Sequence, residues 1–161
     1  MQACGDVDAS EFDRPTVTVS AEIPVRPDQL FAVLEDAAAW PRWLTSIQKV
    51  TWTSPEPKGI GTTRTVEIGN AFVVNEEFIA WETNERMAFR FTDCSRPVFR
   101  QFAEDYRIIG TDKGCRLTWS VLARPRAVPE SVLKLARPVL ALTLRRHLKR
   151  LREYVTVRYG R

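Results

Sequence analysis

The stretch IPVRPDQLFAVLEDAAAWPRWLTSIQKV, residues 23–50, decides the fold that we expect for this chain. Pro24 and Pro27 separate a strand from a helix, in which the apolar side chains of QLFAVL recur at helical spacing. Residues 41–46 are predicted to form a second short helical piece, and Trp40 and Trp43 lie on either side of a proline and an arginine at its start. So much aromatic surface in a short segment indicates that the segment packs against a larger apolar partner.

The hydrophobic period changes on either side of this stretch. Residues 16–23, TVTVSAEI, alternate apolar and polar side chains, which predicts a half-buried strand. From residue 47 to about 125 the period is again two, and turn signals divide this part into six strands. These strands are IQKVTWT, GTTRTVEIG, AFVVNEEFIAWET, RMAFRFTDC, FRQFAEDYRIIG and CRLTWSVLARP. Six sequential strands with short turns predict an antiparallel meander.

One long helix is predicted from Pro129 to about Val157, and Pro138 predicts a kink or a short break near Arg137. Its apolar stripe consists of Val132, Leu133, Ala136, Leu140, Leu144, Leu148, Leu151 and Val155. The order of elements predicts an α+β fold: a curved antiparallel sheet of about seven strands, wrapped around the long C-terminal helix, with two short helices after the first strand. A sheet covered by one helix leaves a gap between the layers at one end, where a ligand would bind.

The composition bounds the domain organisation and the class of protein. A chain of 161 residues with 44% apolar and 27% charged side chains fits one domain, which we place at residues 14–158 after a flexible polar tail of residues 1–13. The start of the chain has no signal-peptide pattern, and no apolar run approaches the roughly 20 residues of a membrane span, so we expect a cytoplasmic protein. Three scattered cysteines and one histidine predict neither a disulfide framework nor a metal site. No cofactor is predicted, because no glycine-rich phosphate loop is present.

The net charge of +4 is concentrated in RRHLKRLR, residues 145–152. Basic residues on the outer face of a terminal helix usually form a solvated surface. We therefore predict no nucleic-acid partner, and we keep contact with a membrane surface as an alternative. The sequence leaves the oligomeric state open.

Strand parity predicts which side chains face the long helix. If residues 83–84 and 112–113 turn two hairpins, both registers give an aromatic inner surface that also includes Phe72. The first hairpin then pairs Ala80 with Met87, Phe78 with Phe89 and Glu76 with Phe91; the second pairs Ile108 with Leu117, Tyr106 with Trp119, Glu104 with Val121 and Phe102 with Ala123.

Glu76 and Glu104 are the most informative polar residues, because both fall on this apolar inner face. Burial disfavours a charged carboxylate unless it has a partner. One interpretation makes them general acids or bases, or hydrogen-bonding anchors for a ligand. The other pairs them with Arg64 or a similar cation, or places them at the wet mouth of the sheet. His147, beside the inward stripe of the last helix, and Tyr106 are the candidate proton donors.

The stretch 23–50, with Asp36 followed by Trp40-Pro41-x-Trp43, resembles the SRPBCC superfamily. The segments GIGTTRTV, VVNEEFIAWETNERMAFRF and YRIIGTDKGCRLTWSV and the amphipathic last helix extend the resemblance over about residues 15–157. Within this START-like, helix-grip superfamily, the chain is similar to the polyketide cyclase/dehydrase and lipid transport group. The resemblance implies a hydrophobic cavity between sheet and helix, with the short helices capping the open side of the sheet. It does not imply one chemistry, because members include carriers and cyclases.

Three hypotheses for the function follow. The first is a carrier or sensor that binds a hydrophobic small molecule such as a lipid, a polyketide or another aromatic or isoprenoid compound. The second is a polyketide cyclase or dehydratase that uses Glu76, Glu104, Tyr106 or His147 as acid and base. The third is a module that docks to a membrane or a partner through its basic last helix. The ligand-binding residues that we expect are Trp43, Phe72, Val74, Phe78, Phe89, Phe91, Phe102, Tyr106, Trp119, Leu140 and Leu144, and Trp43 could equally belong to the core.

Overall fold

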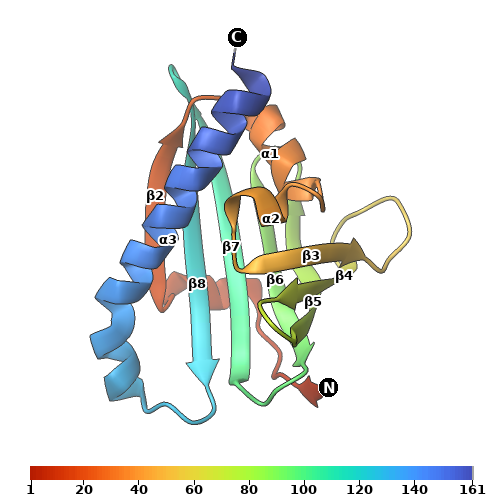
Figure 1. Cartoon of the computed structure of the whole chain (residues 1–161), viewed down its shortest axis with the longest axis vertical. Coiled ribbons are helices and arrows are strands. Elements are labelled where there is room, and N and C mark those ends of the chain that lie inside the picture. Colours follow the sequence, from red (N-terminus) through yellow and green to blue (C-terminus); the bar gives the residue numbers. More distant parts are fainter. Residues whose placement is uncertain (161) are drawn as a thin grey trace.

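The computed structural model describes residues 1–160, with a strongly curved antiparallel sheet and a long helix across its inner face (Figure 1). The strands are β1 (Gln2–Ala3), β2 (Val17–Ile23), β3 (Ile47–Trp52), β4 (Thr63–Ile68), β5 (Phe72–Glu82), β6 (Arg86–Cys94), β7 (Phe99–Thr111) and β8 (Gly114–Pro125). Their order in the sheet is β2-β8-β7-β6-β5-β4-β3, and the short β1 pairs with β6. The predicted α+β class and the meander of six strands are therefore confirmed.

Three α-helices accompany the sheet: α1 (Pro27–Glu35), α2 (Trp40–Trp43) and α3 (Glu130–Tyr159). Pro27 occupies the first position of α1, where the missing N–H costs no hydrogen bond. Gln29 Oε1 accepts a hydrogen bond from the backbone N–H of Arg26 at 3.0 Å and so caps the same end. Trp40 Nε1 donates to the carbonyl oxygen of Leu34 at 2.9 Å. This bond fixes α2 against α1, and both helices then close one end of the core.

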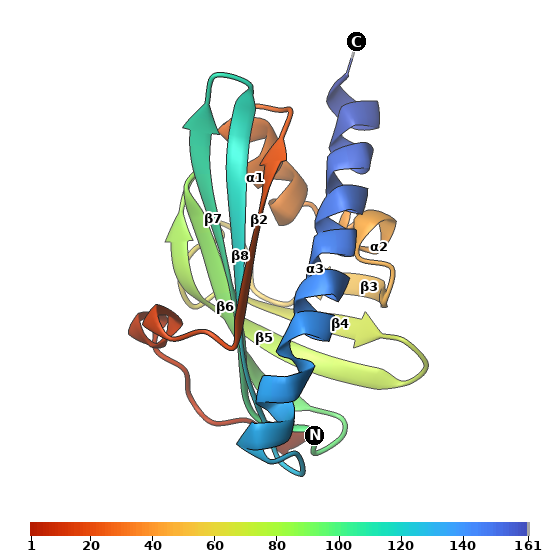
Figure 2. The same cartoon turned by 90° about the vertical axis from the view of Figure 1, so that its left-hand side faces the viewer.

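α3 crosses the inner face of the sheet and packs unevenly along its length (Figure 2). Its buried residues, Leu148, Leu151 and Val155, all lie in its C-terminal half. The helix continues through Pro138 without a break, and the bend in its N-terminal third (Figure 1) agrees with the kink that was the other predicted outcome. No helix within residues 1–160 combines the length and the apolarity that crossing a bilayer requires. Because the N-terminal half of α3 has no fully buried side chain, space is left between it and the sheet.

The β5–β6 hairpin contains a bulge that strand parity did not predict. Ala80 pairs with Ala88 rather than with Met87, because Ile79 is an extra residue in β5. Beyond the bulge the alternation of side chains is shifted, and Trp81 packs against the main core. All the other expected pairs of both hairpins are confirmed.

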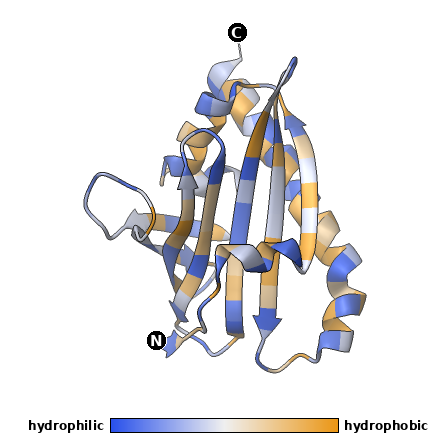
Figure 3. Cartoon of the chain, turned by 180° about the vertical axis from the view of Figure 1, so that it is seen from behind, coloured by the Kyte–Doolittle hydropathy of each residue, from blue (hydrophilic) through white to orange (hydrophobic). Residues whose placement is uncertain are grey.

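The first residues of the chain lie across the outer face of the sheet (Figure 3). Their polar composition predicts a flexible tail, whereas the structure places β1 and a 3-10 helix, η1 (Ala9–Asp13), in this segment. Val7 and Phe12 are buried there in a second apolar cluster with residues of β5, β6, β7 and β8. Val7 and Phe12 are only two apolar side chains in a polar segment, and they give no periodic signal in the sequence. Their burial becomes evident only when the outer face of the sheet is present beneath them.

Candidate functional site

Two adjoining cavities lie between the sheet and the N-terminal half of α3. The inner cavity, next to α2 and β3, has a volume of about 270 Å³, and the outer cavity, towards the start of α3, has about 430 Å³. Phe99, Phe102, Glu104 and Leu144 line both, so the two cavities share a wall. The inner cavity combines aromatic rings with four ionisable side chains, whereas the outer cavity is lined mainly by apolar groups.

Arg64 and Glu76 form a buried ion pair on the wall of the inner cavity. They are register partners on β4 and β5, and Nε of Arg64 donates to Oε2 of Glu76 at 2.5 Å. Their exposed fractions are 1% and 4%. Burial raises the pKa of Glu76, and the charge and hydrogen bond of Arg64 oppose this rise. Of the alternatives that we considered for Glu76, the structure therefore contains the pairing with Arg64.

The remaining nitrogens of Arg64 have no hydrogen-bond partner in the described part of the chain. Nη1 and Nη2 are both buried, and no residue in the described part of the chain accepts from them. The guanidinium carbon lies 4.4 Å from the ring centre of Trp40 and 4.5 Å from that of Phe89. These aromatic faces attract the cation and hold it in place, but they do not satisfy its N–H groups. Because Arg64 lines the inner cavity, an oxygen atom of a bound molecule could accept these hydrogen bonds.

Glu104 lies on the wall that both cavities share. Its Oε2 accepts hydrogen bonds from the hydroxyl of Tyr106 at 2.6 Å and from Nε1 of Trp119 at 3.1 Å. Burial raises the pKa of Glu104 to about 7, although the hydrogen bond from Tyr106 opposes this rise. Burial and the adjacent Glu104 raise the pKa of Tyr106 well above 10, which keeps the phenol protonated. Near neutral pH the carboxyl of Glu104 can therefore either donate or accept a proton.

His147 faces the inner cavity from α3, across from the sheet. Burial lowers the pKa of His147, the charge of Arg150 lowers it further, and a backbone hydrogen bond with Trp43 opposes the shift. The imidazole is therefore neutral at pH 7. Its buried Nδ1 has no partner within residues 1–160, so it is available to a bound molecule.

The structure brings together most of the residues that we expected in the site. Glu76, Glu104 and His147 line the inner cavity, and Tyr106 contacts it only through its hydrogen bond to Glu104. The expected ligand-binding residues that line a cavity are Phe72, Phe89, Phe91, Phe102, Trp119, Leu140 and Leu144. Trp43, Val74, Phe78 and Tyr106 are fully buried and lie behind the cavity walls.

Arg64 is a site residue that the sequence analysis considered only as a possible partner of the two glutamates. The alternation in TRTVEI places Arg64 on the same face as Val66 and Ile68, so parity alone puts a cation inside the sheet. Its unpaired nitrogens could not be foreseen, because they depend on the distances to every neighbouring acceptor. The outer cavity was missed as a separate space for a similar reason: periodicity does not give the distance between α3 and the sheet.

The sequence was compared with models of known protein families, and the family that matches agrees with a cavity between the sheet and α3. Residues 14–156 match the family described as polyketide cyclase/dehydrase and lipid transport. The chain belongs to this family. It is 50% identical over 141 residues to the uncharacterized protein Rv2574 of Mycobacterium tuberculosis, a match that covers 88% of this chain and 84% of the relative. The family resemblance inferred from residues 15–157 is thus confirmed.

Solved structures of low sequence identity share the fold of this family member. A START superfamily protein from Mycobacterium smegmatis superposes with a TM-score of 0.72 at 14% identity, covering 87% of this chain and 98% of that one. The Zhui aromatase/cyclase from a Streptomyces species superposes with a TM-score of 0.62 at 15% identity, covering 85% and 88%. These likenesses confirm the helix-grip architecture, with the long helix across the curved sheet.

The basic segment of α3 is residues 145–152. Of these residues, only His147 lines the inner or the outer cavity. Arg145, Arg146, Lys149 and Arg150 are exposed, and Nη1 of Arg150 donates to Oγ1 of Thr45 at 2.5 Å. Docking to a membrane through this segment stays a prediction.

Proposed function

We propose that this family member is a carrier or sensor that binds a hydrophobic small molecule in the inner and outer cavities. Aromatic and aliphatic side chains form most of both walls, so burial of apolar surface supplies most of the binding free energy, at about 25 cal/mol per Å². A few polar groups in the inner cavity then orient the ligand.

The unpaired Nη1 and Nη2 of Arg64 carry this proposal. A buried donor without an acceptor costs about 1–3 kcal/mol, and more when it is charged. A purely structural role for Arg64 would be fulfilled by the ion pair with Glu76, yet two nitrogens remain without an acceptor at the cavity wall. A ketone, hydroxyl or carboxyl oxygen on an otherwise apolar ligand would accept from them. The preferred ligand is therefore apolar with an oxygen function at its inner end.

A polyketide cyclase or dehydratase is the alternative that a specific observation favours. The pKa of Glu104, about 7, matches the requirement for a general acid or base at neutral pH. The carboxyl and His147 both line the inner cavity, so proton removal and proton donation could occur on the two sides of one bound molecule. Zhui, which shares this fold, is described as an aromatase/cyclase. Cyclase chemistry is therefore compatible with the fold.

Native mass spectrometry of the protein purified from its own host tests the proposal. A copurified lipid, polyketide or isoprenoid, identified after denaturing extraction, would support the binding function and provide the ligand for turnover assays. An apo mass, together with no stabilisation by any compound in a thermal-shift screen, would contradict it.

The variant Glu104→Gln separates the carrier from the enzyme. With the identified ligand, a carrier shows a changed affinity and no product in either form. An enzyme shows product formation that Glu104→Gln abolishes while the ligand still binds.

A further inference from the structure

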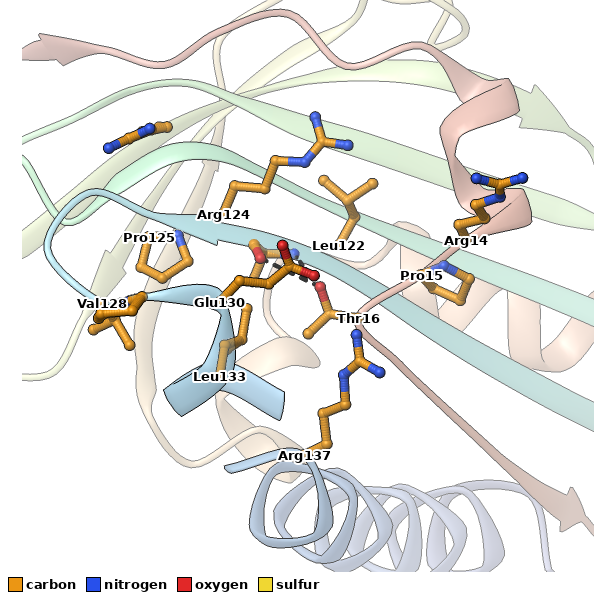
Figure 4. Close-up of a pocket in the computed structure, with 13 residues that line it drawn as sticks. Arg14, Pro15, Thr16, Leu122, Arg124, Pro125, Val128, Glu130, Leu133 and Arg137 are labelled. Carbon is orange, nitrogen blue, oxygen red and sulfur yellow. Dashed lines mark hydrogen bonds between the residues drawn. The ribbon is translucent and has the colours of Figure 1, made fainter. Parts of the chain in front are cut away.

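A third hollow lies next to the outer cavity, at the edge of the sheet where β8 meets the first turn of α3 (Figure 4). Its volume is about 460 Å³. Thr16, Ala123, Pro125, Val128 and Leu133 line both this hollow and the outer cavity. The two spaces therefore adjoin along these mostly apolar side chains.

Four arginines surround this hollow, which we call the arginine pocket: Arg14, Arg100, Arg124 and Arg137. Figure 4 shows Arg14 coming from the segment after η1, Arg124 from β8 and Arg137 from α3. Segments far apart in the sequence thus contribute arginines to the lining of one hollow. Four cations that repel each other at one site are stabilised when an anion binds between them.

Three of these arginines have no anionic partner among residues 1–160. Arg124 forms an ion pair with Glu11 at 3.1 Å, whereas the guanidinium groups of Arg14, Arg100 and Arg137 make no ion pair or side-chain hydrogen bond within residues 1–160. Glu130 is the one carboxylate in the lining, and it pairs with Lys134 at 3.2 Å. The pocket therefore retains an excess of positive charge.

We infer that the arginine pocket binds the anionic group of an amphiphile whose aliphatic chain occupies the outer cavity. The anionic group is a carboxylate or a phosphate, because the planar guanidinium pairs with both in two parallel hydrogen bonds. This inference rests on the proposed binding function and narrows its ligand class to single-chain anionic amphiphiles. Leu133 and Val128 line both spaces, so the ligand would contact them where its aliphatic chain meets its anionic group.

Calorimetric titration with four probes tests the inference: dodecanoate, dodecyl phosphate, dodecanol and inorganic phosphate. We expect dodecanoate, dodecyl phosphate or both to bind at least about tenfold more tightly than dodecanol, because hydrogen bonds between two charged groups are stronger than those to a neutral hydroxyl. The double variant Arg100→Gln/Arg137→Gln should remove this advantage and leave the affinity for dodecanol unchanged. Higher salt should reduce the advantage too, because the pocket is open to solvent.

The double variant Arg42→Gln/Arg146→Gln is the matched control. It removes the same charge from two exposed arginines outside all three hollows, and it should keep the preference for the anionic probes. Circular dichroism verifies that both double variants are folded.

The other outcomes separate this inference from the proposed function. If all three dodecyl probes bind equally, and equally to Arg100→Gln/Arg137→Gln, the headgroup pocket is refuted while hydrophobic binding stands. If inorganic phosphate binds as tightly as dodecyl phosphate, the pocket is a site for a free anion and the amphiphile is refuted. If no dodecyl probe binds, the amphiphile is refuted, and the proposed function is then decided by the native mass spectrometry and the thermal-shift screen described above.

Discussion

The hydroxyl of Tyr106 donates a 2.6 Å hydrogen bond to Oε2 of Glu104, two residues earlier on the same strand. Residues two apart on a strand point to the same face, so this pair forms wherever β7 keeps its regular alternation. Trp119, the register partner of Tyr106 on β8, donates to the same oxygen. Both hydrogen bonds use Oε2, and within residues 1–160 no hydrogen bond is made to Oε1 of Glu104, a residue that lines both cavities.

Glu104 should make the stability of the protein fall as the pH rises. Its pKa is about 7 in the folded state against a reference value of 4.5, so the folded state binds more protons over this interval. Each pKa unit corresponds to about 1.4 kcal/mol, and the free energy of unfolding should therefore decrease by about 3 kcal/mol at most between pH 4.5 and 7.5. Urea unfolding at several pH values measures this. Glu104→Gln should flatten the profile, whereas Glu67→Gln, at an exposed position of β4, should not.

Removal of the Tyr106 hydroxyl should raise the pKa of Glu104 further. The phenol stabilises the ionised carboxylate by donating to it, and Tyr106→Phe deletes that donor. A carbon-13 NMR titration of the glutamate carboxyl groups would show the midpoint of Glu104 above its value in the unmodified protein. Tyr154→Phe, on the C-terminal half of α3, is the control. An unchanged midpoint in Tyr106→Phe would mean that this hydrogen bond does not form in solution.

Arg64 and Glu76 should depend on each other for stability. Arg64→Met leaves a buried carboxylate without its partner and should cost about 3–5 kcal/mol of unfolding free energy. The double variant Arg64→Met/Glu76→Met replaces the pair by apolar side chains and should recover most of this loss. Chemical denaturation of the two single variants and the double variant gives the coupling energy. Additive effects would contradict a direct ion pair.

Filling the outer cavity should block ligand binding without unfolding the protein. Ala136 lines this cavity, so Ala136→Phe places a ring where the ligand would lie. A neutral fluorescent probe, N-phenyl-1-naphthylamine, should bind the unmodified protein and lose most of its signal with this variant. Leu135→Phe is the control, because Leu135 is the preceding residue of the same helix and is 81% exposed. Equal probe binding by both variants would place the ligand elsewhere.

The first residues should contribute to stability through Phe12. This side chain is 7% exposed in the cluster on the outer face of the sheet, and Phe12→Ala should cost about 3 kcal/mol. Ile60→Ala, at a position that is 73% exposed, should change the stability little. Thermal or urea unfolding distinguishes the two. A Phe12→Ala variant as stable as the unmodified protein would restore the interpretation of residues 1–13 as a flexible tail.

Much of the fold followed from local patterns in the sequence. Alternation in six segments gave the meander, prolines gave the start of α1, and the parity of two hairpins placed Glu76 and Glu104 on the inner face. These features depend on the period of a strand or a helix, which each segment carries by itself. The bulge at Ile79 was beyond this reasoning, because the extra residue leaves no mark on an alternating pattern.

By itself, then, the sequence determined the family, the order of the elements and, outside the bulge at Ile79, the face on which most strand residues lie. The tertiary structure alone decided that two nitrogens of Arg64 lack an acceptor, that Oε2 of Glu104 has two donors, and that four arginines from distant segments meet beside the outer cavity. The physical reason is that periodicity is a local property of the chain. Burial, hydrogen-bond satisfaction and the clustering of charge depend on distances between elements, and these distances are fixed only when the sheet curves and α3 packs against it.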